Sequence, residues 1–239
     1  MTPTDVVLSL KNVNAWYGES HVLHGISFDV RKGECVSLLG RNGAGRTTTL
    51  RTIMGLLDRR QGDMVVMGQD ILRWPSHRIA RLGVGYCPEE RGIFASLSCE
   101  ENLMLPPALD GSQSMAMSVQ EIYELFPNLR ERRHSQGTKL SGGEQQMLAL
   151  GRILRTGATL LLLDEISEGL APVIVETMGR AILKLKARGY TIVLVEQNFR
   201  FAAPLSDRLL VVEHGQIAEA IEAGQLKSKM ARLQELLGV

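Results

Sequence analysis

A short apolar run that meets a glycine-rich turn constrains this 239-residue chain more than any other feature. Residues 35–39 read Cys-Val-Ser-Leu-Leu and lead directly into Gly40. After a glycine-rich stretch, apolar residues recur with helical spacing from Thr47 to Leu57. A buried strand, a loop of this kind and a helix, in that order, are typical of an α/β protein that binds phosphate.

Further apolar runs at 159–163, 191–195 and 209–212 alternate with segments of helical spacing. Strands that alternate with helices predict a mostly parallel sheet with both faces covered. Residues 6–14 and 25–30 predict a pair of strands in an N-terminal antiparallel β subdomain. We expect one domain, 1–239, with a helical subdomain inserted at about 98–155 and a flexible loop at Asp110–Ser114.

Composition excludes several classes of protein. Lys and Arg total 27 against 26 Asp and Glu, so the net charge of +1 gives no argument for nucleic-acid binding. The three cysteines form no CxxC pair and read as reduced thiols of a cytosolic protein. The N-terminus lacks the apolar core of a signal peptide, and no run approaches the roughly 18 apolar residues of a membrane span.

The glycine-rich stretch follows the pattern of a phosphate loop. Its glycines let successive backbone N–H groups point at phosphate oxygens, and the helix that follows adds its dipole. The hydroxyl of Thr47 can ligate Mg²⁺, and that of Thr48 can reach an α-phosphate. The residues predicted to bind the nucleotide are Gly40, Arg41, Asn42, Gly43, Ala44, Gly45, Arg46, Thr47 and Thr48.

Arg46 departs from the pattern, which asks for Lys at this position. Lys supplies a compact point charge to the β- and γ-phosphates, whereas Arg is planar, longer and forked. Because positive charge is retained, nucleotide binding is expected. The geometry at the γ-phosphate changes, so we expect an active site that is slowed, with a site that holds ATP without hydrolysing it as the alternative.

Two adjacent carboxylates end the run of four leucines at 160–163. Asp164 and Glu165 therefore lie at the carboxyl edge of a buried strand, where open α/β sheets bind their ligands. Asp164 is predicted to hold Mg²⁺ through water, and Glu165 to act as the general base on the attacking water.

The segment Ser141, Gly142, Gly143, Glu144 begins another helix. Ser141 and Glu144 form a capping box. The two glycines weaken the first helical turn, which suits a helix that must approach a phosphate closely.

The phosphate loop, the Leu140–Glu144 segment and the Asp164–Glu165 pair, in this order, resemble the ATP-binding cassette (ABC) ATPases. The resemblance covers nearly the whole chain. It implies the phosphate-loop NTPase fold, ATP and Mg²⁺ as ligands, and ATP hydrolysis. It also implies a head-to-tail dimer, in which Ser141, Gly142, Gly143 and Glu144 face the γ-phosphate bound by the other subunit.

The resemblance assigns three further positions. Tyr17 matches the aromatic residue that stacks on adenine. Glu89 stands where many relatives have a Gln that contacts Mg²⁺ and water. Gln197 replaces the usual switch His; it can hydrogen-bond the γ-phosphate but cannot carry a proton charge. The family usually has Pro after the acid pair, and Ile166 stands there.

Several stretches are similar to the smaller ATPase subunit of branched-chain amino acid importers, above all Ser167–Pro172 and Val195–Asn198. This implies a second ATPase subunit as heterodimer partner, with a homodimer of the isolated chain left open. It also implies two membrane permease subunits and, indirectly, an extracytoplasmic solute-binding protein, but no nucleic acid. The chain would lie peripherally on the cytoplasmic face of the bacterial inner membrane, and the region 98–136 and the loop after Glu89 would contact the permeases.

Other interpretations stay open on the sequence alone. Urea and short-amide importers share most of these motifs, and an exporter ATPase is a further alternative. A soluble ABC protein acting on nucleic acid or ribosomes usually has two cassettes or long coiled-coil inserts, and this chain has neither.

Overall fold

The computed structural model describes residues 5–109 and 115–238. The predicted loop at Asp110–Ser114 lies outside the described residues. The strands are β1 (Val6–Tyr17), β2 (Ser20–Arg31), β3 (Cys35–Leu39), β4 (Arg59–Val66), β5 (Gln69–Asp70), β6 (Val84–Cys87), β7 (Leu160–Asp164), β8 (Thr191–Glu196), β9 (Arg208–Glu213) and β10 (Gln216–Glu222). The α-helices are α1 (Arg46–Ile53), α2 (Ser76–Ala80), α3 (Cys99–Met104), α4 (Val119–Leu125), α5 (Pro127–Glu131), α6 (Gly142–Thr156), α7 (Pro172–Ala187), α8 (Phe199–Ala202) and α9 (Leu226–Leu237).

The central sheet has six strands in the order β10-β9-β3-β8-β7-β6. All neighbours pair in parallel except β10, which is antiparallel to β9 at one edge. The carboxyl ends of β3, β6, β7 and β8 therefore meet at one edge of the sheet. Four predicted parts of the site lie at or just after the ends of these strands and therefore meet at this edge. They are the phosphate loop, Glu89, the Asp164–Glu165 pair and Gln197.

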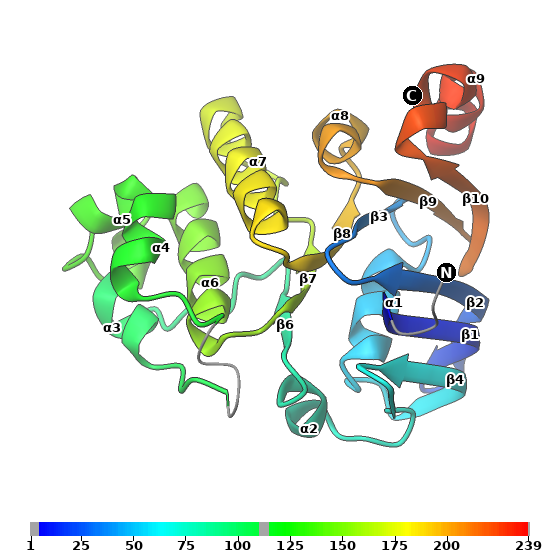
Figure 1. Ribbon diagram of the computed structural model, residues 1–239, viewed down its shortest axis with the longest axis horizontal. Coiled ribbons are helices and arrows are strands. Elements are labelled where there is room, and N and C mark those ends of the chain that lie inside the picture. Colours follow the sequence, from blue (N-terminus) through cyan, green and yellow to red (C-terminus); the bar gives the residue numbers. More distant parts are fainter. Residues whose placement is uncertain (1–4, 110–114, 239) are drawn as a thin grey trace.

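Alternate side chains of the buried strands pack on opposite faces of this sheet. Leu161 and Leu163 of β7 join the apolar cluster formed with α6 and α7, whereas Leu160 and Leu162 join the cluster formed with α1 and the N-terminal strands. Figure 1 shows α1 and α6 on opposite sides of β7. The prediction of a mostly parallel sheet covered on both faces is confirmed.

The N-terminal strands form the predicted antiparallel β subdomain. Its four-stranded sheet has the order β2-β1-β4-β5. Both predicted strands are longer than the sequence pattern indicated, because β1 and β2 continue to the tight turn between Tyr17 and Ser20. Leu10 and Ile26 point from this sheet into the same apolar cluster as Leu50 of α1, so the subdomain covers the helix that follows the phosphate loop.

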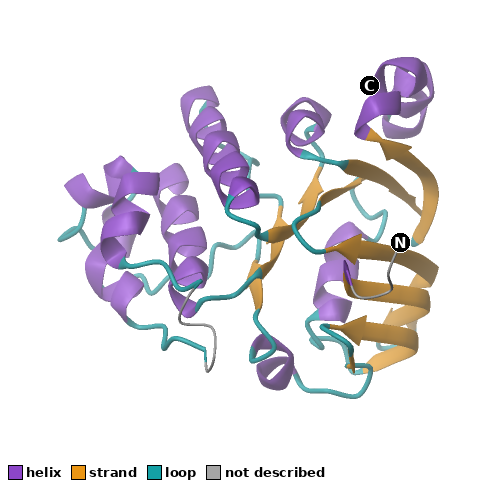
Figure 2. Ribbon diagram, viewed as in Figure 1, coloured by secondary structure: helices purple, strands orange, loops and turns teal. Residues whose placement is uncertain are grey.

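Short helices between β6 and β7 form a separate group with α6, to the left in Figure 2. The predicted capping box at the start of α6 is present, since the Ser141 hydroxyl accepts from the Glu144 N–H. A second box begins α3, where the Ser98 hydroxyl accepts from the Glu101 N–H. A third box, from Ser118 to Glu121, opens α4 and was not predicted.

One helix boundary differs from the prediction. The helix expected to reach Leu57 ends at Ile53, because Gly55 adopts a φ of +69° and turns the chain. The terminal helix starts at Leu226, because Glu222 still pairs with Arg208 in β10 and β9. Among the described residues, no helix has both the length and the apolar character needed to cross a membrane.

Candidate nucleotide site

The phosphate loop joins β3 to α1 with a backbone that requires glycine. Gly43 and Gly45 have φ values of +79° and +108°. At Gly40 a Cβ atom would overlap the carbonyl oxygen of Val212 in β9. Within the described part of the chain no side chain caps the N-terminus of α1, so its first N–H groups are available for phosphate oxygens.

Thr47 and Asp164 meet at the end of β7. The Thr47 hydroxyl donates to Asp164 Oδ1 at 2.9 Å, and the Tyr86 hydroxyl donates to Asp164 Oδ2 at 3.0 Å. Burial raises the pKa of Asp164, while both hydrogen bonds oppose that shift. The carboxylate is thus held from both sides, with Oδ1 toward Thr47 and Oδ2 toward Tyr86.

Arg46 points at the second carboxylate of the pair. Its Nη2 lies 2.8 Å from Glu165 Oε1 and also donates to Asn42 Oδ1 at 3.1 Å. The two side chains are only 4% and 10% exposed. Nη1 of Arg46 is buried and has no hydrogen-bond partner within the described residues. The sequence identified Arg46 as a departure but did not predict this ion pair.

Glu165 follows β7 in a left-handed backbone conformation with φ of +49°, an uncommon value for a residue with a side chain. Its N–H donates to the Val195 carbonyl. Burial raises the pKa of Glu165 to about 7, assisted by a hydrogen bond and charge repulsion from Glu168 and opposed by Arg46. A carboxyl group with a pKa near neutrality suits a general base.

A hollow of about 270 Å³ lies beside this carboxylate. It is lined by residues that follow β7 and β8, among them Glu165, Glu168 and Gln197. Gln197 is exposed on this hollow. The structure therefore brings together the two residues predicted to act in catalysis.

Glu196 links the loops that follow β7 and β8. Its carboxylate accepts from the Ser167 N–H at 3.0 Å and from the Ser167 hydroxyl at 2.7 Å. Burial raises the pKa of Glu196 to about 7, against these two hydrogen bonds. The two hydrogen bonds link the loop that contains Glu168 to the strand that ends before Gln197.

Glu89 and Tyr17 lie at the rim of the site. Glu89 is exposed, and its charge raises the pKa values of both Asp164 and Glu165, which places it near the acid pair. Tyr17 is 41% exposed at the end of β1. Tyr17 and Tyr86 raise the pKa of Arg51, which places this Arg near both tyrosines.

The segment of Ser141, Gly142, Gly143 and Glu144 lies apart from the phosphate loop of its own chain. It begins α6, which packs on the sheet face opposite to α1. A Cβ atom at Gly143 would lie 2.6 Å from the Ile174 side chain of α7, and one at Gly142 would lie 3.0 Å from the Arg91 guanidinium. The glycines therefore have a packing reason within the chain, which the sequence interpretation did not include.

Sequence reasoning missed several residues that shape the site. Tyr86 lies in the short strand β6, and a polar ring tip near the end of an apolar run was the available signal. Glu196 lies in a stretch quoted for its family likeness, without a role. Glu168 lies in the run Ser167–Pro172, also quoted for its family likeness, but its effect on Glu165 was not predicted. Arg51 carried no local signal, because its contacts are tertiary. These residues are Arg51, Tyr86, Glu168 and Glu196.

Comparison with known proteins shows the family. A family profile described as "ABC transporter" matches residues 23–168. A high-affinity branched-chain amino acid transport ATP-binding protein, BraG of Pseudomonas aeruginosa, is 41% identical over 88% of this chain and 91% of its own length. The lipopolysaccharide export system ATP-binding protein LptB of Escherichia coli K12 is 33% identical over 88% of each chain.

Solved structures show the same fold. A nucleotide-free ATP-binding cassette from an ABC transporter has a TM-score of 0.83 at 22% identity, covering 98% of this chain and 99% of its own. A dimeric ATP-binding cassette in a post-hydrolysis state, bound to ADP and Pi, has a TM-score of 0.77 at 22% identity over 90% of this chain and 98% of its own. The chain belongs to the ABC transporter family, as an ATP-binding subunit of the kind that hydrolyses ATP.

Proposed function

We propose that this chain is the ATP-hydrolysing subunit of an importer for branched-chain amino acids. One observation carries the chemistry: the phosphate loop, Asp164 and Glu165 converge at one edge of the sheet, with Thr47 and Arg46 bonded to the two carboxylates. The choice of solute rests on the 41% identity to a branched-chain amino acid transport protein.

The nucleotide would lie along the phosphate loop. The backbone N–H groups of the loop and of the first turn of α1 would bind the phosphates, with Thr48 at the α-phosphate. Arg41 and Ala44 complete this loop, and their carbonyl and N–H groups are already joined in a turn at 3.1 Å. Tyr17 is exposed at the rim, where its ring face can stack on adenine.

The donor set beside the loop fits Mg²⁺. Thr47 and Asp164 supply a hydroxyl and a carboxylate within 2.9 Å of each other, and Glu89 supplies a second carboxylate nearby. Within the described residues no cluster of three or more His, Cys, Asp or Glu could hold a metal by itself. This matches Mg²⁺, which combines one or two protein ligands with substrate phosphate oxygens. When bound, the ion would neutralise charge on the phosphates.

Hydrolysis would use the hollow beside Glu165. The Glu165 carboxylate would accept a proton from the water that attacks the γ-phosphate in line. Gln197, on the same hollow, would donate a hydrogen bond to the γ-phosphate. Because both side chains line the same hollow, a role for both in one step is supported.

Dimerisation would complete the site. Because α1 and α6 pack on opposite faces of the sheet, one chain cannot close its own Ser141–Glu144 segment over its own phosphate loop. A second ATPase subunit placed head to tail would supply that segment. Dimers occur among the solved relatives of this fold.

The helical subdomain at 98–155 would transmit dimer closure to two permease subunits, which a solute-binding protein supplies with solute. Apolar side chains are exposed there, with Met104 65% and Leu105 48% exposed, and Phe94, just before the subdomain, is 49% exposed. The Phe94 ring packs against the guanidinium of Arg152, which lines a hollow of about 380 Å³ together with Arg91 and Pro106. We place the chain on the cytoplasmic face of the inner membrane through this contact.

Uptake in cells tests the proposal. Cells that depend on this chain should take up labelled leucine, and the chain should co-purify with two membrane subunits. Glu165→Gln should keep the co-purification and lose uptake. Uptake that is unchanged by deletion of the chain, with co-purification of lipid-export components, would contradict the importer.

A second candidate is an ATP-holding subunit whose partner performs hydrolysis. The ion pair between Arg46 and Glu165 favours it, because the general base is occupied in the resting structure.

Identities of 33–34% to lipopolysaccharide export ATPases favour an exporter as the alternative assembly, and urea or amide importers share the motifs.

A further inference from the structure

We infer that Arg46 makes this site discriminate between nucleoside triphosphates and diphosphates, by exchanging the Glu165 carboxylate for the γ-phosphate. The inference rests on the proposed function, because it requires nucleotide at the phosphate loop. It concerns an ion pair that arises from the Arg in this chain's own loop.

The resting partners of Arg46 leave its guanidinium partly unsatisfied. Nη2 serves both Glu165, at 2.8 Å, and Asn42, at 3.1 Å. Nη1 is buried and lacks a partner within the described residues, although a buried donor without an acceptor is costly. The buried Nη1 is therefore a donor with which the guanidinium can engage an incoming phosphate before it gives up the carboxylate.

The position of Arg46 places this capacity on the γ-phosphate side of the site. It stands where the phosphate-loop pattern carries the side chain that reaches the β- and γ-phosphates. The next residue, Thr47, is bonded to Asp164, and the guanidinium reaches across to Glu165. The cation and the general base thus face the same place in the site.

The charge of the γ-phosphate makes a triphosphate act on this ion pair differently from a diphosphate. A γ-phosphate brought beside Glu165 repels a carboxylate that already lies near Glu168 and Glu89, and it attracts Arg46. When Arg46 moves to the γ-phosphate, Glu165 is released to accept a proton from water. A diphosphate has no group at this place and leaves the ion pair closed, so only the triphosphate frees the general base.

A double-mutant cycle tests the exchange. Dissociation constants for ATP and ADP are measured by calorimetry at pH 8 in EDTA, which prevents hydrolysis. The proteins are the wild type, Glu165→Gln, Arg46→Ala and the double variant. We expect Glu165→Gln to tighten ATP binding at least tenfold and to change ADP binding less than threefold, and the gain for ATP to fall below threefold in the Arg46→Ala background.

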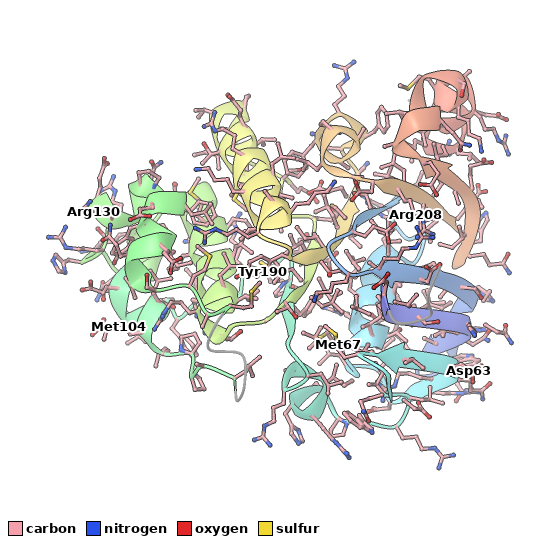
Figure 3. All side chains as sticks on the ribbon, in the orientation of Figure 1. Asp63, Met67, Met104, Arg130, Tyr190 and Arg208 are labelled. Atoms are coloured by element: carbon pink, nitrogen blue, oxygen red, sulfur yellow. The ribbon has the colours of Figure 1, made fainter. Side chains whose placement is uncertain are left out.

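A matched control is the buried ion pair between Arg208, labelled in Figure 3, and Glu34, whose atoms lie 3.2 Å apart. Glu34 precedes β3, at the end opposite to the phosphate loop, so Glu34→Gln should leave both affinities unchanged. An equal ATP gain with and without Arg46, or an equal gain for ADP, would overturn the exchange and leave nucleotide binding intact. No binding of either nucleotide by any variant would instead overturn the proposed function.

Discussion

At the scale of single residues, Arg46 decides what this phosphate loop does at rest. A Lys would present one compact charge, whereas the fork of Arg46 reaches Asn42 and Glu165 together. The sequence showed that the residue was unusual. Its partner could not be predicted, because Glu165 reaches it only through the pairing of β7 with β8 and of β8 with β3.

Tyr86 is predicted to position Asp164 for the metal. Tyr86→Phe removes the hydrogen bond at 3.0 Å and should weaken the apparent Mg²⁺ affinity about tenfold, because bonds to a metal-binding carboxylate fix its orientation. The measurement is the thermal stabilisation by a non-hydrolysable ATP analogue as Mg²⁺ is titrated.

Tyr190→Phe is the control for Tyr86→Phe. The Tyr190 hydroxyl, on a residue labelled in Figure 3, donates to the Met115 carbonyl at 2.9 Å. Both variants should lose about 1 kcal/mol of stability, but only Tyr86→Phe should change the Mg²⁺ dependence. An equal Mg²⁺ response in the two variants would contradict the role of Tyr86.

Glu196 is predicted to make stability depend on pH. Because its folded pKa of about 7 lies above the ordinary 4.5, the folded state binds more protons between these values, and this contribution to stability is lost as pH rises from 4.5 to 7. Glu196→Gln should remove about 2–3 kcal/mol of that dependence. Urea unfolding from pH 4.5 to 8 measures it, and parallel curves for wild type and variant would contradict the prediction.

At the scale of elements, the sequence predicted most of the central sheet, since β3, β7 and β8 are continuous apolar runs whose ends carry polar motifs. The helical spacing of apolar residues predicted the end of α1 wrongly, because the backbone turns at Gly55. In the site, Thr47, Asp164, Glu165 and Gln197 were predicted by motif and lie together. The contacts of Arg46, Tyr86 and Glu196 were not predicted, because local pattern does not contain tertiary pairing.

The helix α6 offers a test of why glycine stands at its start. Gly143→Ala should destabilise the protein by about 1–3 kcal/mol through overlap with Ile174, and Gly143→Ala with Ile174→Ala should recover part of that loss. Gly142→Ala, which meets the flexible end of Arg91, is the milder control. Denaturant unfolding gives the stabilities.

ATP hydrolysis by the assembled dimer then separates packing from function. Recovered stability without recovered hydrolysis would support the approach of α6 to the partner's phosphate. Recovery of both would mean that packing alone explains the glycine.

At the scale of the whole molecule, the packing of α1 and α6 on opposite faces of the central sheet predicts that two chains form a dimer. Light scattering of Glu165→Gln with MgATP should show twice the 26.3 kDa of one chain, because ATP would join two surfaces that one chain keeps apart. Adding Ser141→Arg should leave the single-chain mass. Adding Ser118→Arg, in the capping box of α4, should still allow the dimer, and a loss of dimer in both variants would contradict a specific role for Ser141.

The loop containing Arg46 is predicted to form a working catalytic site. The test is MgATP hydrolysis by the wild type, Arg46→Lys and Glu165→Gln, with ATP binding recorded for all three. We predict turnover by the wild type and a loss of at least about 100-fold in Glu165→Gln, with binding retained. Tight ATP binding without hydrolysis in the wild type, with hydrolysis restored by Arg46→Lys, would contradict this prediction and identify a nucleotide-holding subunit.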